Sequence, residues 1–106
     1  MRDFTWSEAE KKAARRAFDT ALKKECAALM KRLKSLATKA ENPDDIWAIH
    51  DFLTEQRKAI DEKYDYRYSQ LIMVFGRLLR ESWIDDEDFE GLSEEKLNAI
   101  RLIASF

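Results

Sequence analysis

Apolar residues recur at helical spacing along the first third of this 106-residue chain. The later steps of the series alternate between four and three residues, as in a heptad. Its members are Ala14, Phe18, Leu22, Cys26, Leu29, Leu33 and Leu36. Ser7 and Glu10 have the spacing of a capping box, and neither glycine nor proline follows before Pro43. The pattern predicts one helix over residues 7–39, ~48 Å long at 1.5 Å per residue.

A second helix is expected to begin at Pro43, the only proline, which follows a polar turn. The short turn predicts that this helix runs antiparallel to the first. Its expected apolar side is Ile46, Ile49, Leu53, Ile60 and Tyr64. Nothing beyond residue 64 must break a helix, so the pattern allows either one helix to about residue 81 or two helices with a bend near Asp65.

The last third of the chain predicts a small packed unit. Residues 71–75 are apolar on nearly all sides of a helix, which favours a central position. An acidic connection follows, and its apolar anchors are Trp83, Ile84 and Phe89. Ser93 is a suitable cap for a final helix. The buried side of that helix is expected at Leu97, Ile100 and either Ile103 or Ala104. The predicted fold is all-α, a single domain over residues 1–106 with an antiparallel two-helix stalk at about 7–64 and a C-terminal helical head at about 65–106.

The length of the first helix predicts self-association. One short partner helix cannot cover a helix of this length, so two copies are expected to form an elongated homodimer. The predicted dimer interface consists of apolar positions on both stalk helices, namely Phe18, Leu22, Leu29, Leu33, Ile46, Ile49 and Leu53.

A second face of the Pro43 helix combines aromatic and polar side chains. Its members repeat at three and four residues and are Trp47, His50, Asp51, Thr54 and Arg57. Trp and Arg are enriched where partners bind most strongly, and exposed charges can fix the register of a complex. The face therefore predicts a partner-binding surface. In the alternative, Trp47 and His50 pack in the homodimer seam, and a surface around a two-fold axis can serve both purposes.

Composition narrows the classes of partner. The net charge of −2 gives no reason to expect nucleic acid binding. The charge is uneven, because the first third is basic and the last quarter is acidic. Such ends can steer a charged partner or simply be solvated helix faces. The basic first helix also leaves open a peripheral association with an anionic membrane surface.

The lone Cys26 excludes an intramolecular disulfide, and its place in the apolar series predicts a buried thiol. No apolar run approaches the roughly 20 residues that span a bilayer, and no signal-peptide core is present. The protein is expected to be soluble and cytoplasmic.

Catalytic chemistry is not expected. His50 is the only histidine, and its neighbour Asp51 should point about 100° away on a helix, which prevents a base–orienter pair. The sequence lacks a glycine-rich phosphate loop and the ligand spacing of a metal site. We expect neither enzyme activity nor a metal or other cofactor.

The central part of the chain resembles the fluorescence recovery protein family. The resemblance rests on the run from Asp45 to Leu53, on Arg57, on the run from Ile60 to Asp65 with Arg67, and on Val74-Phe75 with Leu78-Leu79. It extends weakly to the segment from Trp6 to Glu10. The run Trp-x-x-His-Asp-Phe-Leu with a downstream Lys-Tyr-Asp is its most specific part.

The resemblance implies an all-helical homodimer without pigment that binds the photoactivated, red form of the orange carotenoid protein, chiefly through its C-terminal domain. Such proteins speed the return to the orange form, help it leave the phycobilisome and so end fluorescence quenching. This work takes place in the cytoplasm, on the cytoplasmic side of thylakoid membranes. Trp47, His50, Asp51 and Arg57 correspond to the family's functional patch.

The resemblance also implies a second partner contact in the head. Here the chain carries Met73 and Ala99 where relatives can have an aromatic and a basic residue, with Phe75 beside them. The alternative function is that of a dimeric helical adaptor for a different, non-photosynthetic partner.

Overall fold

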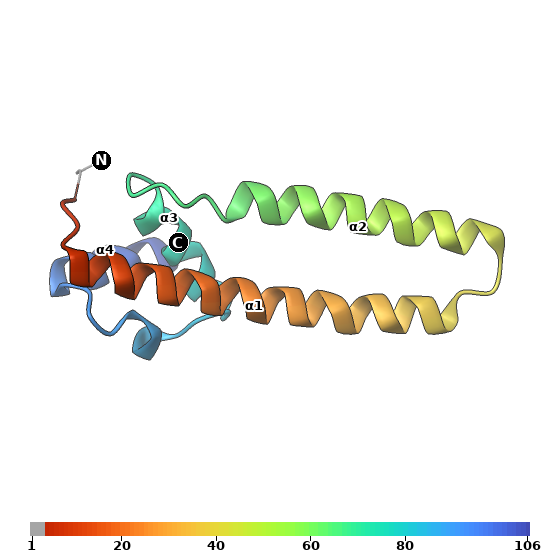
Figure 1. Cartoon of the computed structure of the whole chain (residues 1–106), viewed down its shortest axis with the longest axis horizontal. Helices are drawn as coiled ribbons and strands as arrows, with labels where there is room; N and C mark the ends of the chain where they lie inside the picture. Colours follow the sequence, from red (N-terminus) through yellow and green to blue (C-terminus); the bar gives the residue numbers. More distant parts are fainter. Residues whose placement is uncertain (1–3) are drawn as a thin grey trace.

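The longest element is helix α1, Glu8–Lys39, which runs the length of the molecule (Figure 1). A computed structural model describes residues 4–106, so the first three residues of the predicted domain lie outside the described part. The expected capping box begins α1: the Glu10 amide donates to Ser7 Oγ at 3.1 Å, and the Ser7 amide donates to Glu10 Oε1 at 3.1 Å. The predicted helix start is confirmed.

Helix α2, Pro43–Lys63, runs back along the second half of α1 (Figure 1). Asp45 closes the turn between them, because its Oδ2 accepts the amides of Glu41 at 2.9 Å and Asn42 at 3.0 Å. These two hydrogen bonds lower the pKa of Asp45. The antiparallel stalk expected from the short turn is therefore present.

The helix does not continue to residue 81. Residues 64–70 are irregular, and α3 occupies Leu71–Arg80. Of the two predicted alternatives, two helices with a break near Asp65 is correct. The break follows a Tyr64 backbone at φ −91° and ψ 65°, which leaves the helical region.

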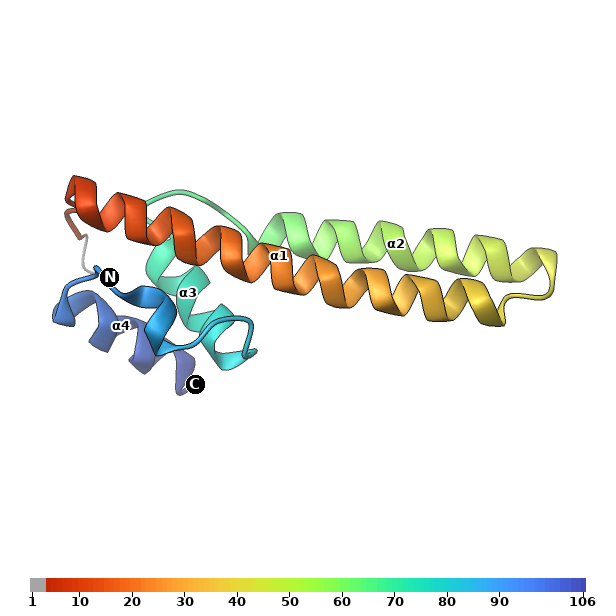
Figure 2. The same cartoon turned by 60° about the horizontal axis from the view of Figure 1, so that its bottom comes forward.

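The remaining elements complete the head. The 3-10 turn η1 spans Asp86–Phe89, and α4 spans Glu94–Ala104. Ser93 caps α4 as predicted, because its Oγ accepts the Lys96 amide at 3.3 Å. Figure 2 shows α3 and α4 beside the first half of α1, at the end opposite the α1–α2 turn.

The core lies in the head and includes the first half of α1. The buried residues that α1 contributes are Ala13, Ala14, Ala17, Phe18 and Ala21. The fully buried large side chains are Phe75, Phe89, Leu71, Leu78 and Ile100. Small side chains on α1 let the other elements approach its backbone closely. The head thus uses a segment of α1 that the sequence had placed in the stalk.

The molecule is elongated, with extents of 53 × 25 × 24 Å. Its radius of gyration is 16.7 Å, whereas a compact domain of this length would have about 13 Å. Residues 4–106 contain four α-helices and no strand. The prediction of an elongated all-α fold is confirmed. Within the same residues, no helix is both long and apolar enough to cross a membrane.

A buried ion pair fastens the N-terminal segment to α4. Lys96 Nζ donates to Glu10 Oε2 at 2.9 Å and to the Thr5 carbonyl at 2.7 Å. Both side chains are largely buried, at 6% exposed for Lys96 and 13% for Glu10. The hydrogen bond from Lys96 lowers the pKa of Glu10 to about 2, against the opposing effect of burial.

We expect Glu10→Gln to lower the free energy of unfolding at pH 7 by about 2 kcal/mol, because Lys96 loses its buried counter-charge. The pKa of Glu10 is depressed from 4.5 to about 2 on folding. Its contribution is therefore complete above pH 4.5 and is lost as the pH falls toward 2. Urea unfolding across this pH range should show the wild-type and variant curves converging in acid. Glu8→Gln, at an 87% exposed side chain, is the control, and a constant gap between wild type and Glu10→Gln would contradict the assignment.

A second polar network, built around the buried Lys63, joins the stalk to the head, and we call it the junction (Lys63, Glu25, Glu81 and Tyr64). Lys63 Nζ lies 2.6 Å from Glu25 Oε2 and 2.7 Å from Glu81 Oε1. Tyr64 donates its hydroxyl to Glu25 Oε1 at 2.8 Å, and burial together with this bond raises the pKa of Tyr64. Burial alone would raise the pKa of Glu81, but hydrogen bonds from Lys63 and Arg77 lower it to about 2. The junction links α1, the end of α2 and the end of α3.

Candidate functional site

The predicted partner-binding residues share the solvent-facing side of α2. We call this set the α2 outer surface, and its members are Trp47, His50, Asp51, Thr54 and Arg57. All are exposed, and Trp47 is 64% exposed despite its size. The opposite side of α2 faces α1 through half-buried residues such as Ile49 and Phe52. The helical spacing therefore placed these five side chains together correctly.

The side chains of the α2 outer surface contact one another along the helix. The Trp47 and His50 rings lie edge to face, with centroids 6.5 Å apart. His50 Nδ1 lies 3.5 Å from Asp51 Oδ1, so the prediction that these neighbours point too far apart to meet is wrong. Thr54 donates its hydroxyl to the His50 carbonyl at 3.0 Å, and Arg57 pairs with Asp61 at 3.8 Å.

The His50–Asp51 contact lies in solvent, with side chains 69% and 81% exposed. Water screens such a pair strongly, so its energetic contribution is small. No group of three or more His, Cys, Asp or Glu side chains within residues 4–106 could hold a metal ion. The surface is suited to recognising a partner protein, because it offers an aromatic ring, a hydrogen-bonding ring and charges of both signs.

The residues predicted for the dimer interface divide into three groups. Ile46 is 60% exposed at the edge of the α2 outer surface. The second group is half-buried in the stalk and comprises Leu22, Leu29, Leu33, Ile49 and Leu53. Phe18 is buried in the chain's own core, where Tyr64 and Tyr66 meet its ring edge to face at 5.3 and 4.8 Å. That position corrects the interface prediction for Phe18, because a second copy cannot reach a side chain enclosed by the head.

Two further predictions about burial are wrong. Cys26, expected to be buried, is exposed, although Lys63 and Tyr64 at the end of α2 contact its neighbour Glu25. Phe75, expected at a partner contact, is fully buried against Phe89, with ring centroids 5.2 Å apart. The other head candidates remain accessible: Met73 is 40% exposed, and Ala99 is half-buried.

Sequence patterns missed two exposed apolar features. Leu102 is 60% exposed and lies three residues after Ala99 on the same side of α4, whereas Phe106, 81% exposed, lies beyond the end of that helix. Met30, on α1, is 56% exposed. Helical spacing alone could have separated Leu102 from the buried residues of α4, but the exposure of Met30 depends on where α2 lies.

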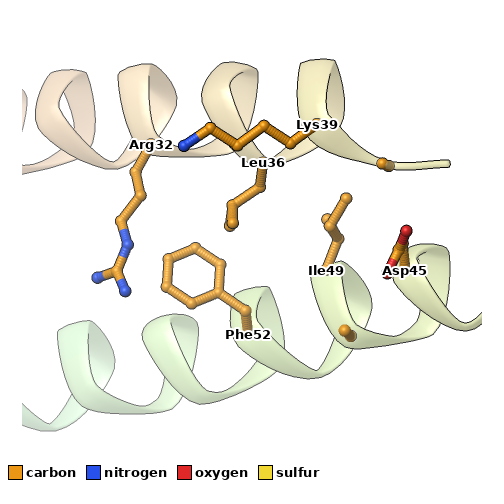
Figure 3. A pocket seen from close by; sticks show the side chains of 8 residues that line it. Arg32, Leu36, Lys39, Asp45, Ile49 and Phe52 are labelled. Carbon is orange, nitrogen blue, oxygen red and sulfur yellow. The ribbon is translucent and has the colours of Figure 1, made fainter.

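Near the turn, α1 and α2 leave a cavity between them, which we call the stalk-tip groove (Figure 3). Its volume is about 270 Å³. The lining residues are Arg32, Leu36, Lys39, Ala40, Asp45, Ala48, Ile49 and Phe52. None of them belongs to the α2 outer surface. The stalk thus presents two separate surfaces with different chemistry.

Comparison with known proteins places the chain in one family. Residues 6–104 match the family described as photoprotection regulator fluorescence recovery protein. A fluorescence recovery protein from Synechocystis sp. (strain ATCC 27184 / PCC 6803 / Kazusa) is 36% identical over 99 residues, which cover 93% of this chain and 91% of that protein.

Solved structures of such proteins share the fold. The fluorescence recovery protein of Fremyella diplosiphon is 35% identical with a TM-score of 0.90, over 96% of this chain and all of that one. The protein from Synechocystis sp. PCC 6803 gives the same identity, TM-score and coverage. An arginine-to-lysine variant of the Synechocystis protein is 34% identical, also with a TM-score of 0.90. On sequence and fold together, the chain belongs to the fluorescence recovery protein family of photoprotection regulators.

Proposed function

We propose that this protein binds the photoactivated, red form of an orange carotenoid protein and accelerates its return to the orange form. The contact is chiefly with the C-terminal domain of the carotenoid protein, and recovery of that protein ends quenching of phycobilisome fluorescence. Family membership and the exposed α2 outer surface support this proposal. The observation that carries it is Trp47, a large aromatic side chain left 64% exposed beside His50 and Asp51.

The proposed action requires no bond-making chemistry. A binding protein shifts an equilibrium only by its different affinities for the two states. It accelerates their interconversion when it holds the arrangement on the path more tightly than the starting state. We infer that the α2 outer surface binds the opened carotenoid protein, and that the accessible head residues Met73 and Ala99 approach it as a second contact.

We further propose that two copies pair through their stalks. Large apolar side chains are exposed along the stalk, with Met30 at 56%, Ile46 at 60% and Trp47 at 64%. Such side chains favour an interface, and a two-fold axis beside Ile46 would bring two α2 outer surfaces together. In this arrangement Trp47 and His50 serve both the seam and the partner. The dimer would work in the cytoplasm, where the phycobilisome meets the thylakoid membrane.

The direct test mixes the purified protein with a photoactivated orange carotenoid protein and follows the colour change in the dark. Acceleration of the red-to-orange conversion at a stoichiometric amount of dimer is expected. An unchanged recovery rate would overturn the proposal and favour an adaptor for a different partner. Sedimentation of the mixture then reports whether a complex forms at all.

Trp47→Ala should slow the accelerated recovery by about tenfold, because truncation of a buried interface anchor commonly costs 1–2 kcal/mol or more. Asp51→Ala should act in the same direction with a smaller effect. The measurement is the recovery rate at a protein concentration where sedimentation shows each variant to be dimeric.

Lys24→Ala, an exposed change on α1 outside both stalk surfaces, is the matched control and should leave the rate unchanged. Wild-type recovery rates with Trp47→Ala in an intact dimer would show that the α2 outer surface is not the contact.

A further inference from the structure

The stalk-tip groove combines an apolar floor with a cationic rim. The side chains of Leu36, Ile49 and Phe52 point into the space between the helices (Figure 3). Arg32 and Lys39 both come from α1; the Arg32 side chain reaches across the space toward Phe52, whereas Lys39 lies along α1 (Figure 3). Ala40 and Ala48 add small apolar surface to the lining. An apolar floor beside two cations is suited to an occupant that is itself apolar and acidic.

The two cations carry charge that the described chain leaves unneutralised. Among residues 4–106, neither Arg32 nor Lys39 forms an ion pair. Arg32 instead places its guanidinium 4.5 Å from the centroid of the Phe52 ring. The one carboxylate in the lining, Asp45, stays ionised and directs its Oδ2 to the backbone amides of Glu41 and Asn42, with no ion pair to either cation. With two cations and one anion, the lining has a net positive charge that favours an incoming acid.

The size of the groove limits what it can hold. At about 270 Å³, it is smaller than the roughly 300–1,000 Å³ of sites that enclose a drug-sized ligand. Interfaces between proteins, by contrast, are often anchored by one large side chain seated in a small pocket. Charge around such an anchor fixes register and steers approach.

We propose that the stalk-tip groove is a second protein-docking site, which takes a segment with one large apolar side chain flanked by carboxylates. The apolar side chain seats on Leu36, Ile49 and Phe52. The flanking carboxylates pair with Arg32 and Lys39. Because the groove shares no residue with the α2 outer surface, both sites can be filled at once. The site is independent of the identity of the partner at the α2 outer surface.

The test uses NMR titration of the ¹⁵N-labelled full-length protein with a blocked pentapeptide of four glutamates around a central phenylalanine. Shift changes should concentrate at Arg32, Leu36 and Phe52, with an affinity that falls as salt is raised. A serine in place of the phenylalanine, or lysines in place of the glutamates, should abolish these changes. Equal binding of all three peptides, or no shifts at the groove, would overturn the proposal.

Two double variants of equal charge distinguish binding at the groove from nonspecific attraction between the acidic peptide and the basic helix α1. The double variant Arg32→Gln with Lys39→Gln should weaken peptide binding by about fivefold, as expected for the loss of two exposed charge contacts. Lys31→Gln with Lys34→Gln removes the same charge from exposed positions on α1 next to Arg32 but outside the groove and should leave binding within about twofold. Equal loss in both variants would overturn the proposal.

The protein itself offers the rival occupant. Were a second copy to fill the groove, Arg32→Gln with Lys39→Gln would change the dimer dissociation constant in sedimentation experiments. An unchanged dimer with lost peptide binding supports the proposal, whereas an altered dimer overturns it. Binding of the wild-type protein to anionic phosphatidylglycerol vesicles that the same variant abolishes would assign the cations to a lipid surface and would equally overturn it.

Discussion

Lys63→Met is expected to lower the free energy of unfolding by about 3 kcal/mol, because it removes the only cation shared by two carboxylates at the junction. The Lys63 side chain is 6% exposed, and its ammonium lies 2.6 Å from Glu25 and 2.7 Å from Glu81. Methionine keeps most of the aliphatic stem, so the loss reports the charge and not a cavity. Arg77 and Trp83 still donate to Glu81, which keeps the cost at the lower end for a buried pair. Urea unfolding at pH 7 and fixed protein concentration measures it.

Two companion variants make this result specific. Lys58→Met removes an exposed cation from the same helix and should change stability by less than about 0.5 kcal/mol. Adding Glu25→Gln to Lys63→Met removes one of the uncompensated carboxylates and should restore about 1 kcal/mol. If Lys63→Met and Lys58→Met were equally stable, the junction would not hold the stalk to the head.

Contacts just after the junction explain why the break after α2 could not be predicted. The sequence from Lys63 to Tyr68 contains neither glycine nor proline, so its local propensity permits a helix. Tertiary contacts instead determine that the helix ends at Lys63. Tyr66 leaves the helical path to meet Phe18 edge to face at 4.8 Å, with the Arg15 guanidinium 3.7 Å from its ring centroid. These partners lie about 50 residues earlier in the chain, beyond the reach of any periodicity.

Helix starts were predictable because their signals are local. Ser7 and Ser93 each accept the backbone amide three residues later, and Pro43 presets φ at the first position of α2. The packing of the head against α1 was harder to predict from the sequence. Of the alanines at positions 13, 14, 17 and 21, only Ala14 belongs to the predicted apolar series, yet all four are buried where α1 meets the head. A small side chain gives no signal of how closely a distant element approaches it.

The candidate sites also divide into one that local sequence predicts and one that depends on packing between helices. The α2 outer surface was predictable because five side chains on one helix share a face by spacing alone. The stalk-tip groove was not, because Arg32 and Phe52 come from different helices and meet only when α1 and α2 pair. Phe18 was misassigned to the dimer interface because helical spacing identifies an apolar face without identifying what covers it. Phe75 was expected at a partner contact only from the resemblance, whereas the apolar pattern of residues 71–75 correctly predicted its central position.

Gly76 should not tolerate a side chain, because α4 lies directly against the α3 backbone there. A Cβ at this position would lie 2.3 Å from Ile103 Cγ2 and 2.5 Å from Ile103 Cβ, with the Ile100 carbonyl oxygen at 3.3 Å. We expect Gly76→Ala to cost about 2 kcal/mol and Gly76→Val about 3 kcal/mol or more, measured as free energy of unfolding in urea. The sign of the change in the free energy of unfolding tests the contact, because a glycine-to-alanine change in an uncrowded helix is stabilising by about 1 kcal/mol.

The partner of the clash provides the decisive control for Gly76. Ile103→Ala removes Cγ2 but keeps Cβ, so the double variant Gly76→Ala with Ile103→Ala should regain only part of the loss and show a clear coupling energy. Strict additivity of the two changes would mean that α4 has room to move away, and a Gly76→Ala variant more stable than wild type would show that the helices are not in contact there. Since α4 carries Ala99 and α3 carries Met73, a displacement of α4 would also separate the two head residues expected to meet the partner. Gly76→Ala should therefore weaken any contribution of the head to carotenoid-protein recovery while leaving the α2 outer surface intact.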